Sequence, residues 1–298
     1  MATEATIPRN QAQDAQKLYD DRAASYDNTW HPRFARHIVE LAHLQPGEKV
    51  LDLACGTGLV TFPASTGVGE TGHVTGIDVS SGMLAQARAK RKKHGIGNIT
   101  FHQHSITDLR VDSLHANQFD VIFCASALVL LEHPGQALQD WTRYLKPGGR
   151  LITDVTHPEC QISLITFERV GRRLGRSLPF YRVPFQQPED LQRMLEDAGL
   201  RNIYFTFLSQ LGHRASEDIV AFKEDLAEPR IEATYTVEDT DLMFDKHIGQ
   251  WAAEPLSTPD VIQKAREIFK EEWAKLADES GRIQEVDGVF VGIGRKPG

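Results

Sequence analysis

The sequence predicts an α/β protein built on a largely parallel sheet, and three features of the chain support that prediction. Short apolar runs alternate with segments of helical periodicity between residues 36 and 156, which is the pattern of right-handed β-α-β crossovers. A glycine-rich turn, Ala54 to Gly58, directly follows the first of these runs. A helical pattern and two further apolar runs after residue 187 extend the alternation toward the C-terminus.

The individual elements follow from periodicity, composition and end signals. Apolar and β-branched residues mark strands at 49–54, 72–79, 98–105, 119–126, 148–156, 202–209 and 288–295. Apolar residues at helical spacing mark helices at 36–44, 80–95, 133–145, 187–200, 216–226 and 258–279. A serine cap and Gly95 bound the helix at 80–95, and Pro188 and Gly199 lie near the ends of the helix at 187–200.

Charge and cysteine content narrow the classes of function. The 298 residues carry a net charge of −8, which opposes nonspecific attraction to nucleic acid or to an anionic membrane. Cys55, Cys124 and Cys160 are too scattered for a disulfide framework or a metal site, so we expect no metal. The chain shows no signal-peptide pattern and no apolar run near the ~20 residues of a membrane span. We therefore expect a cytoplasmic protein without a nucleic-acid partner or a membrane span.

Two glycine-rich stretches compete as ligand-binding turns. TGVGETG, residues 66–72, matches the dinucleotide pattern G-x-G-x-x-G, but it follows the end of a helix and precedes a strand. A phosphate-binding turn needs the opposite order, because the helix after it supplies free N–H groups. VLDLACGTG, residues 50–58, has that order but carries Thr61 where the third glycine would fall. The second stretch is therefore the predicted turn, and it suits a carboxylate-bearing ligand better than a pyrophosphate.

Asp78 ends the second predicted strand, beside this turn in a parallel sheet. An acid at that position can accept hydrogen bonds from both hydroxyls of a ribose. Asp78 and the turn together predict a site for a nucleoside that bears an amino-acid tail.

Four motifs in register resemble the class I S-adenosylmethionine-dependent methyltransferases. They are VLDLACGTG, GIDVSSGMLAQAR, FDVIFCASALVLLEHPGQAL and YLKPGGRLI, with YDDRAASYD near the start. The resemblance covers about residues 19–156 and is to the branch of ubiquinone and menaquinone biosynthesis enzymes and natural-product tailoring enzymes. It implies a Rossmann-like, mostly parallel sheet of seven strands, with helices on both faces, the last strand antiparallel and a helical cap.

The resemblance also implies which residues hold S-adenosylmethionine, whose product is S-adenosylhomocysteine. The methionine part would contact Asp52 and the turn of Ala54, Cys55, Gly56, Thr57 and Gly58. The ribose would bind Asp78, and the adenine would contact Val79, Met83, Ser105 and Ile106. The methionine amino group would face Cys124 and Ala125, and a lid would contribute Tyr19 and Tyr26.

The length of the segments between the predicted strands indicates a cap around the core. We expect an N-terminal helical lid at 1–40 and a cofactor-binding core at 41–156. A cap insertion at 157–187 then precedes a core helix and strand at 188–209, and a helical insertion at 210–287 precedes the final strand at 288–298. The cap is expected to cover the open edge of the sheet.

Methyl transfer to a small organic acceptor is the expected activity. The cofactor supplies the reactive methyl group, and alignment of the acceptor supplies much of the catalysis. An O, N or S nucleophile of a secondary metabolite is the expected target. The candidate bases near the strand ends are His133, Asp154, His157 and Glu159, of which His157 is the best located, and His31 could close over the acceptor.

Two other activities remain open at this stage. A protein of this fold can bind the cofactor and catalyse a reaction without methyl transfer, such as a cyclisation. A nicotinamide-dependent oxidoreductase uses a similar sheet, although Thr61 disfavours it. We expect a monomer or a homodimer.

Overall fold

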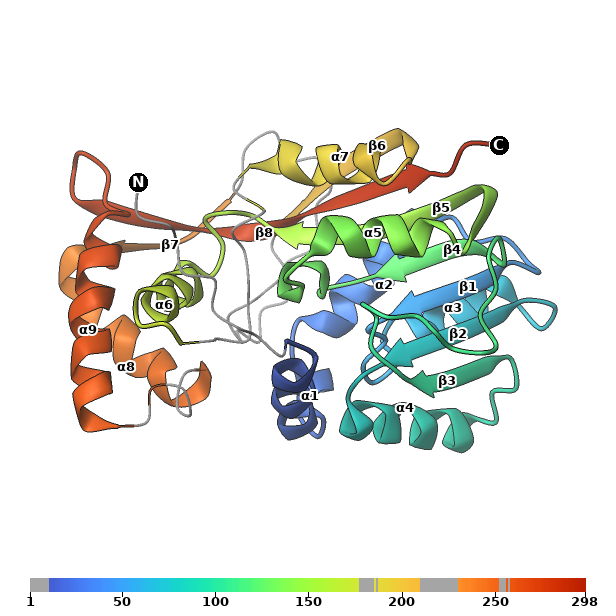
Figure 1. Cartoon of the computed structure of the whole chain (residues 1–298), viewed down its shortest axis with the longest axis horizontal. Helices are drawn as coiled ribbons and strands as arrows, with labels where there is room; N and C mark the ends of the chain where they lie inside the picture. The colour runs from blue at the N-terminus through green and yellow to red at the C-terminus, as the bar shows by residue number, and fades with distance from the viewer. Residues whose placement is uncertain (1–10, 177–184, 186, 210–229, 252–255, 257) are drawn as a thin grey trace.

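The computed structural model describes residues 11–176, 185, 187–209, 230–251, 256 and 258–298 (Figure 1). Its strands are β1 (Lys49–Leu53), β2 (His73–Asp78), β3 (Ile99–Gln103), β4 (Phe119–Cys124), β5 (Leu145–Thr156), β6 (Arg201–Ser209), β7 (Arg230–Thr236) and β8 (Arg282–Arg295). The sheet runs in the order β3-β2-β1-β4-β5-β8-β6, and β8 is antiparallel to both of its neighbours. The predicted mostly parallel fold with an antiparallel last strand is thus confirmed.

Helices cover both faces of this sheet. They are α1 (Gln11–Arg22), α2 (His31–Leu41), α3 (Thr61–Val68), α4 (Ser81–His94), α5 (Pro134–Thr142), α6 (Ile162–Arg173), α7 (Pro188–Asp197), α8 (Thr240–Trp251) and α9 (Pro259–Ala274), with short 3-10 turns η1 (Tyr26–Asn28), η2 (Leu128–Leu130) and η3 (Val237–Asp239). α2, α3 and α4 contribute to one buried apolar cluster, and α5 and α7 contribute to another. Because strands buried on both faces need apolar side chains on both, β4 is apolar except for Asp120, and β1 is apolar except for Lys49 and Asp52.

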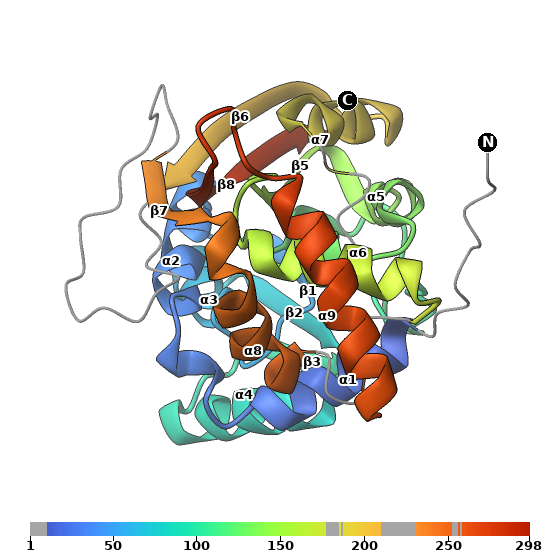
Figure 2. The ribbon, with the colours of Figure 1, turned by 90° about the vertical axis from the view of Figure 1, so that its left-hand side faces the viewer.

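The cap has a core of its own. Phe167 of α6, Phe244 of α8 and Phe269 of α9 are fully buried against one another, with the rings of Phe167 and Phe269 4.8 Å apart. Figure 1 shows these helices beyond the carboxyl ends of the parallel strands, and Figure 2 shows them in front of the sheet from that side. The cap therefore faces the strand ends where ligands bind in open α/β sheets, rather than a lateral edge.

The predicted insertion at 210–287 is not purely helical. β7 pairs with residues 282–287 of β8, so β8 begins at Arg282 instead of at residue 288. Only Ile283 and Val286 are apolar in this part of β8, and Glu285 and Asp287 are buried despite their charge. A search for apolar runs therefore does not detect the strand here. The predicted helix at 216–226 lies outside the described residues, and the domain boundaries stay predictions.

Candidate active site

The turn after β1 adopts the conformation that its glycines allow. Ala54, Gly56 and Gly58 have positive φ angles of 56°, 54° and 90°, and the Gly58 N–H donates to the Cys55 carbonyl at 2.8 Å. A Cβ atom placed on Gly56 would meet only the Tyr26 ring, 4.0 Å away. Open space therefore lies beside the backbone of this turn, as a site for a closely bound ligand requires.

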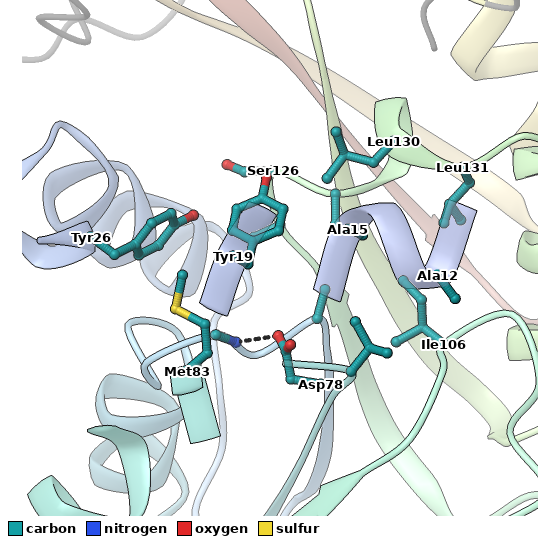
Figure 3. Close-up of a pocket in the computed structure, with 15 residues that line it drawn as sticks. Ala12, Ala15, Tyr19, Tyr26, Asp78, Met83, Ile106, Ser126, Leu130 and Leu131 are labelled. Carbon is teal, nitrogen blue, oxygen red and sulfur yellow. Dashed lines mark hydrogen bonds between the residues drawn. The ribbon is translucent and has the colours of Figure 1, made fainter. Parts of the chain in front are cut away.

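A pocket begins at this turn, and the space in it, open solvent included, is about 640 Å³. We call it the α1 pocket, because helix α1 crosses over it in Figure 3. Its lining residues are Ala12, Ala15, Tyr19, Tyr26, Ala54, Gly56, Asp78, Val79, Met83, Ile106, Ala125, Ser126, Ala127, Leu130 and Leu131. Nine predicted cofactor residues, from Tyr19 to Ala125, are among them. The pocket thus joins the ends of four neighbouring strands to the N-terminal helix.

Asp78 supplies the buried charge of the α1 pocket. Its Oδ2 accepts the Gly56 N–H and its Oδ1 accepts the Ser80 N–H, both at 2.8 Å. Burial raises the pKa of Asp78, and the hydrogen bonds from these backbone groups oppose that shift. The carboxylate therefore fastens the turn after β1 to the end of β2 while its remaining lone pairs border the pocket (Figure 3).

A second, smaller pocket adjoins the first. The space in it, open solvent included, is about 360 Å³, and we call it the α2 pocket. Its lining residues are Tyr26, His31, Phe34, Ala35, Asp52, Ala54, Cys55, Gly56, Leu59, Val60, Ala125 and Ser126. Tyr26, Ala54, Gly56, Ala125 and Ser126 line both pockets, so a ligand in one would touch a ligand in the other along this shared wall.

Asp52 lies in the wall of the α2 pocket. It is 1% exposed, and its Oδ2 accepts a 2.5 Å hydrogen bond from the Thr61 hydroxyl. Burial raises the pKa of this carboxyl to about 7, although the bond from Thr61 opposes the rise. Thr61, which stands where a dinucleotide motif has glycine, thus holds the acid in place.

Four predicted cofactor residues lie in neither pocket wall. Thr57 is buried and donates from its hydroxyl to Asp27 at 2.5 Å, and Gly58 packs over the Phe62 ring. The Ser105 hydroxyl pairs with Thr107, and the Cys124 carbonyl accepts from the Thr153 hydroxyl at 2.8 Å. These residues support the turn and the strand ends rather than line the two pockets.

The three candidate histidines occupy different surroundings. His31 lines the α2 pocket, with its ring 4.4 Å from that of Tyr26. His157 packs against the rings of Phe207 and Phe290, and burial lowers its pKa. His133 is exposed at the start of α5. Of the three, only His31 is among the residues lining either pocket.

Several pocket residues escaped the sequence analysis. Ala12 and Ala15 line the α1 pocket together with Tyr19 because they share one face of α1 at helical spacing. Leu130 and Leu131 also line the α1 pocket, and they follow the fourth strand inside the motif FDVIFCASALVLLEHPGQAL. Ser126, with a φ of 55°, belongs to the wall shared by both pockets. A small residue right after a buried parallel strand is the sequence signal that marks Ser126.

The literal G-x-G-x-x-G stretch takes no part in either pocket. It spans the end of α3 and the loop before β2, as predicted. Gly69 has φ 66° and ψ −172°, and a Cβ on Gly72 would lie 2.7 Å from the Glu48 carbonyl oxygen. Glycine is needed here for the shape of the loop.

Among the described residues no group of three or more His, Cys, Asp or Glu is arranged to hold a metal ion. Within the same residues, no helix has the length and apolar character to cross a membrane.

Comparison of the sequence with known proteins identifies a matching family and several relatives. The model of a family described as a methyltransferase domain matches residues 44–199. Ubiquinone/menaquinone biosynthesis C-methyltransferase UbiE of Shewanella pealeana is 32% identical over 192 residues, which cover 59% of this chain and 75% of that protein. Aklanonic acid methyltransferase DauC of Streptomyces sp. strain C5 is 31% identical over 138 residues, covering 45% of this chain and 61% of that protein.

Solved structures share the fold at lower sequence identity. The YcgJ protein of Bacillus subtilis superimposes with a TM-score of 0.55 at 15% identity, covering 89% of this chain and 99% of that one. Phosphoethanolamine N-methyltransferase 2 of Haemonchus contortus, solved with phosphomonomethylethanolamine and S-adenosylhomocysteine, has a TM-score of 0.52 at 16% identity, covering 89% and 53%. At these sequence identities the comparison shows only that the folds are similar.

Proposed function

This chain belongs to the methyltransferase domain family and is an S-adenosylmethionine-dependent methyltransferase, and from that premise we propose that it methylates a small aromatic acceptor bearing an ionisable hydroxyl group. The wall shared by the α1 and α2 pockets carries this proposal, because it brings two adjoining cavities into contact at the strand ends. One cavity would hold the cofactor and the other the acceptor.

The α1 pocket fits S-adenosylmethionine by the chemistry of its lining. The carboxylate of Asp78 suits the ribose hydroxyls, and the apolar side chains of Val79, Met83 and Ile106 suit the adenine. The open space beside Gly56 would admit the chain that joins the ribose to the amino acid. When bound, this cofactor supplies an electrophilic methyl group on a positively charged sulfur. Tyr19 and the alanine face of α1 would exclude water from it.

The α2 pocket fits a flat acceptor. Tyr26, His31 and Phe34 line it, and the rings of Trp30 and His31 stack 4.1 Å apart behind it. Aromatic side chains of this kind present large apolar faces and prefer offset or edge contacts with other rings. An acceptor ring held there would lie against the same shared wall as the methyl group.

An ionisable aromatic hydroxyl lets one acceptor class take a methyl group on oxygen or on carbon. Loss of the proton from an aromatic hydroxyl gives an anion whose electron pair is shared between the oxygen and the ring carbons beside it. Such an acceptor can take a methyl group on oxygen, as expected for an O, N or S nucleophile, or on carbon. UbiE, by its name, is a C-methyltransferase of quinone biosynthesis, and DauC acts on aklanonic acid.

Calorimetry and a labelled-methyl assay test this proposal. We expect S-adenosylhomocysteine to bind the purified protein and NADH not to bind, since Thr61 replaces the third glycine of the dinucleotide pattern. With methyl-labelled cofactor, 1,4-naphthoquinol should gain label, and its ether analogue 1,4-dimethoxynaphthalene should not. Product NMR then identifies the methylated atom. If S-adenosylhomocysteine does not bind, the cofactor site is contradicted. If 1,4-dimethoxynaphthalene gains label, the requirement for a hydroxyl group is contradicted. If the acceptor is chemically changed but gains no label, the reaction is one without methyl transfer.

A further inference from the structure

Two buried hydroxyl groups near the ends of β4 and β5 have no hydrogen-bond partner. They are Oγ of Ser126 and Oγ1 of Thr156. Buried polar groups in folded proteins are nearly always paired, so an unpaired one calls for a functional explanation such as a missing ligand or water. Ser126 belongs to the wall shared by the two pockets, where the proposed acceptor and cofactor meet, and its hydroxyl oxygen is buried next to that wall.

A buried acid lies directly behind Ser126. Asp154 of β5 is 3% exposed, and its Oδ1 accepts a 2.7 Å hydrogen bond from the Ser126 N–H. Its Oδ2 accepts no hydrogen bond from the described residues. Thr156 is two residues further along the same strand, so its side chain points to the same face of the sheet as Asp154. Asp154 and the Thr156 hydroxyl therefore lie on the same face of β5, and the bond from the Ser126 N–H joins Asp154 to the end of β4. Neither Asp154 nor Thr156 is among the residues that line the two pockets, so Ser126 connects this group to the shared wall.

We propose that Asp154 is the proton acceptor of the reaction, and that the hydroxyls of Ser126 and Thr156 orient the acceptor's ionisable hydroxyl toward Oδ2 of Asp154. This proposal rests on the methyltransferase function proposed above and names the residues that activate its acceptor. The acceptor's O–H bond breaks and its proton goes to Oδ2. For methylation on oxygen, the electron pair left on that oxygen forms the new bond to the methyl carbon. For methylation on carbon, that pair forms a C=O bond while a ring π pair forms the bond to the methyl carbon, and the proton of the methylated ring carbon then moves through solvent to the oxygen, which restores the hydroxyl. The methyl–sulfur bond breaks and its electron pair stays on sulfur, so the positive charge lost there equals the proton gained by Asp154.

The electrostatics of Asp154 suit this role. Burial raises its pKa to about 7, with the Ser126 N–H opposing the rise. A general base works best when its pKa lies near the working pH. Tyr26 of η1 and Cys124, on the opposite face of the sheet in β4, are poor alternatives. Burial raises the pKa of each well above its usual value, and the Asp154 charge adds to the rise.

The neighbouring residues His157 and Asp52 are less suitably placed than Asp154 to accept a proton from the acceptor. His157 packs on the opposite face of β5 from Asp154, since it contacts Phe290, which pairs with Val155. Asp52 shares the face of Asp154, but its Oδ2 already accepts the Thr61 hydroxyl. Asp52 lines the α2 pocket, and we assign it to the methionine end of the cofactor, which would reach that pocket across the shared wall. Asp52 is therefore the variant against which Asp154 must be compared.

The decisive variant is Asp154→Asn, since an amide oxygen can still accept the Ser126 N–H and the fold is kept. With 1,4-naphthoquinol and methyl-labelled cofactor, we expect kcat to fall at least 100-fold. The Kd of S-adenosylhomocysteine should change less than twofold. Asp52→Asn should instead weaken S-adenosylhomocysteine binding. The exposed Asp112→Asn should match the wild type in both measurements.

Measurements of acceptor binding and of the pH dependence of the rate show whether Ser126, Thr156 and Asp154 take part in the chemistry or only support the structure. Ser126→Ala and Thr156→Val remove hydroxyls that pair with nothing, so each should leave the melting temperature within about two degrees. Each should weaken binding of 1,4-naphthoquinol to the S-adenosylhomocysteine complex about three- to tenfold by calorimetry. The wild-type rate should fall about tenfold per pH unit on the acid side, and Asp154→Asn should lose that limb.

The possible results separate a failure of the Asp154 assignment from a failure of the proposed methyltransferase function. A wild type that binds no adenosyl ligand contradicts the proposed function itself. A wild type that methylates 1,4-naphthoquinol while Asp154→Asn keeps more than half of its kcat overturns the assignment of Asp154 alone. A loss of S-adenosylhomocysteine affinity in Asp154→Asn that equals its loss of rate also overturns it, since Asp154 would then serve the cofactor. A wild type that binds the cofactor and leaves 1,4-naphthoquinol unmethylated contradicts the acceptor class and this assignment together.

Discussion

The backbone N–H of Gly56 donates a 2.8 Å hydrogen bond to Oδ2 of Asp78, and this bond joins the glycine turn of β1 to the end of β2. The two parts of the predicted nucleoside site are thus one unit before any ligand arrives. Preorganisation of this kind lowers the cost of binding, because neither the turn nor the carboxylate has to be ordered by the ligand.

Asp78→Asn should weaken S-adenosylhomocysteine binding at least tenfold. The amide keeps one oxygen for a backbone N–H but loses the charge that strengthens bonds from ribose hydroxyls, and charge-assisted bonds contribute roughly 1.5–3 kcal/mol. Calorimetry measures the change, with the exposed Asp112→Asn as a control for a lost surface carboxylate. Equal affinity in the wild type and Asp78→Asn would remove the ribose assignment.

The two glycine stretches can be separated by a matched pair of variants. Gly56 and Gly69 both have positive φ angles, 54° and 66°, so an alanine strains the backbone at either position. Gly56→Ala adds a methyl group to the open space of the α1 pocket, whereas Gly69→Ala meets no atom within 4 Å. We expect both to lower the free energy of unfolding by about 1–3 kcal/mol. Only Gly56→Ala should weaken S-adenosylhomocysteine binding, and an equal effect of Gly69→Ala on affinity would restore the G-x-G-x-x-G stretch as a ligand site.

Cofactor binding should be coupled to the release of protons. Burial holds the pKa of Asp52 at about 7 in the ligand-free protein, and a cation beside it would favour the ionised form. The pKa should therefore fall when S-adenosylmethionine binds, so the affinity rises as the pH increases from 5.5 to 7 and levels off above. S-adenosylhomocysteine lacks the sulfonium charge and should show a shallower slope. Calorimetry in buffers of different ionisation enthalpy counts the protons, and identical slopes for the two ligands would count against this coupling.

The local parts of the site could be predicted from the sequence, and the parts made by distant segments could not. The turn at Ala54 to Gly58 and Asp78 follow from a strand-turn-helix order that is visible in the chain. The unpaired hydroxyl of Ser126 and its bond to Asp154 depend on how β4 and β5 end side by side, 28 residues apart in the chain. His133 illustrates the reverse case, because a position near a strand end does not place its side chain in a pocket.

Arg150 is expected to be a main support of the core. Its guanidinium is 9% exposed and pairs with the Glu48 carboxylate at 2.7 Å, and its Nε donates to the Ala42 carbonyl at 2.7 Å. Arg150→Met removes the cation that pairs with Glu48 and the donor to the Ala42 carbonyl at the end of α2, so we expect a loss of about 3 kcal/mol in the free energy of unfolding. Urea unfolding measures it. Adding Glu48→Gln should recover part of the loss, and a single variant within 1 kcal/mol of the wild type would contradict this role.

Asp20 is expected to control how long the cofactor stays bound. Its Oδ1 accepts the Ser80 hydroxyl at 2.5 Å and the Gly82 N–H at 2.8 Å, which fastens α1 to the start of α4. The same helix lines the α1 pocket through Ala12, Ala15 and Tyr19. Because Asp20→Ala releases this attachment without touching the pocket wall, S-adenosylhomocysteine should dissociate about tenfold faster, with little change in the association rate.

Stopped-flow displacement measures the dissociation rate in this comparison. Asp21→Ala serves as the control, since Asp21 is an exposed acid on the same helix and next to Asp20 in the chain. An unchanged dissociation rate in Asp20→Ala would mean that α1 covers the pocket without limiting release. A slower association with unchanged dissociation would mean that Asp20 shapes the entrance instead. In either case the attachment of α1 to α4 would not be what retains the ligand, because a helix that holds a ligand in place must be released before that ligand can leave.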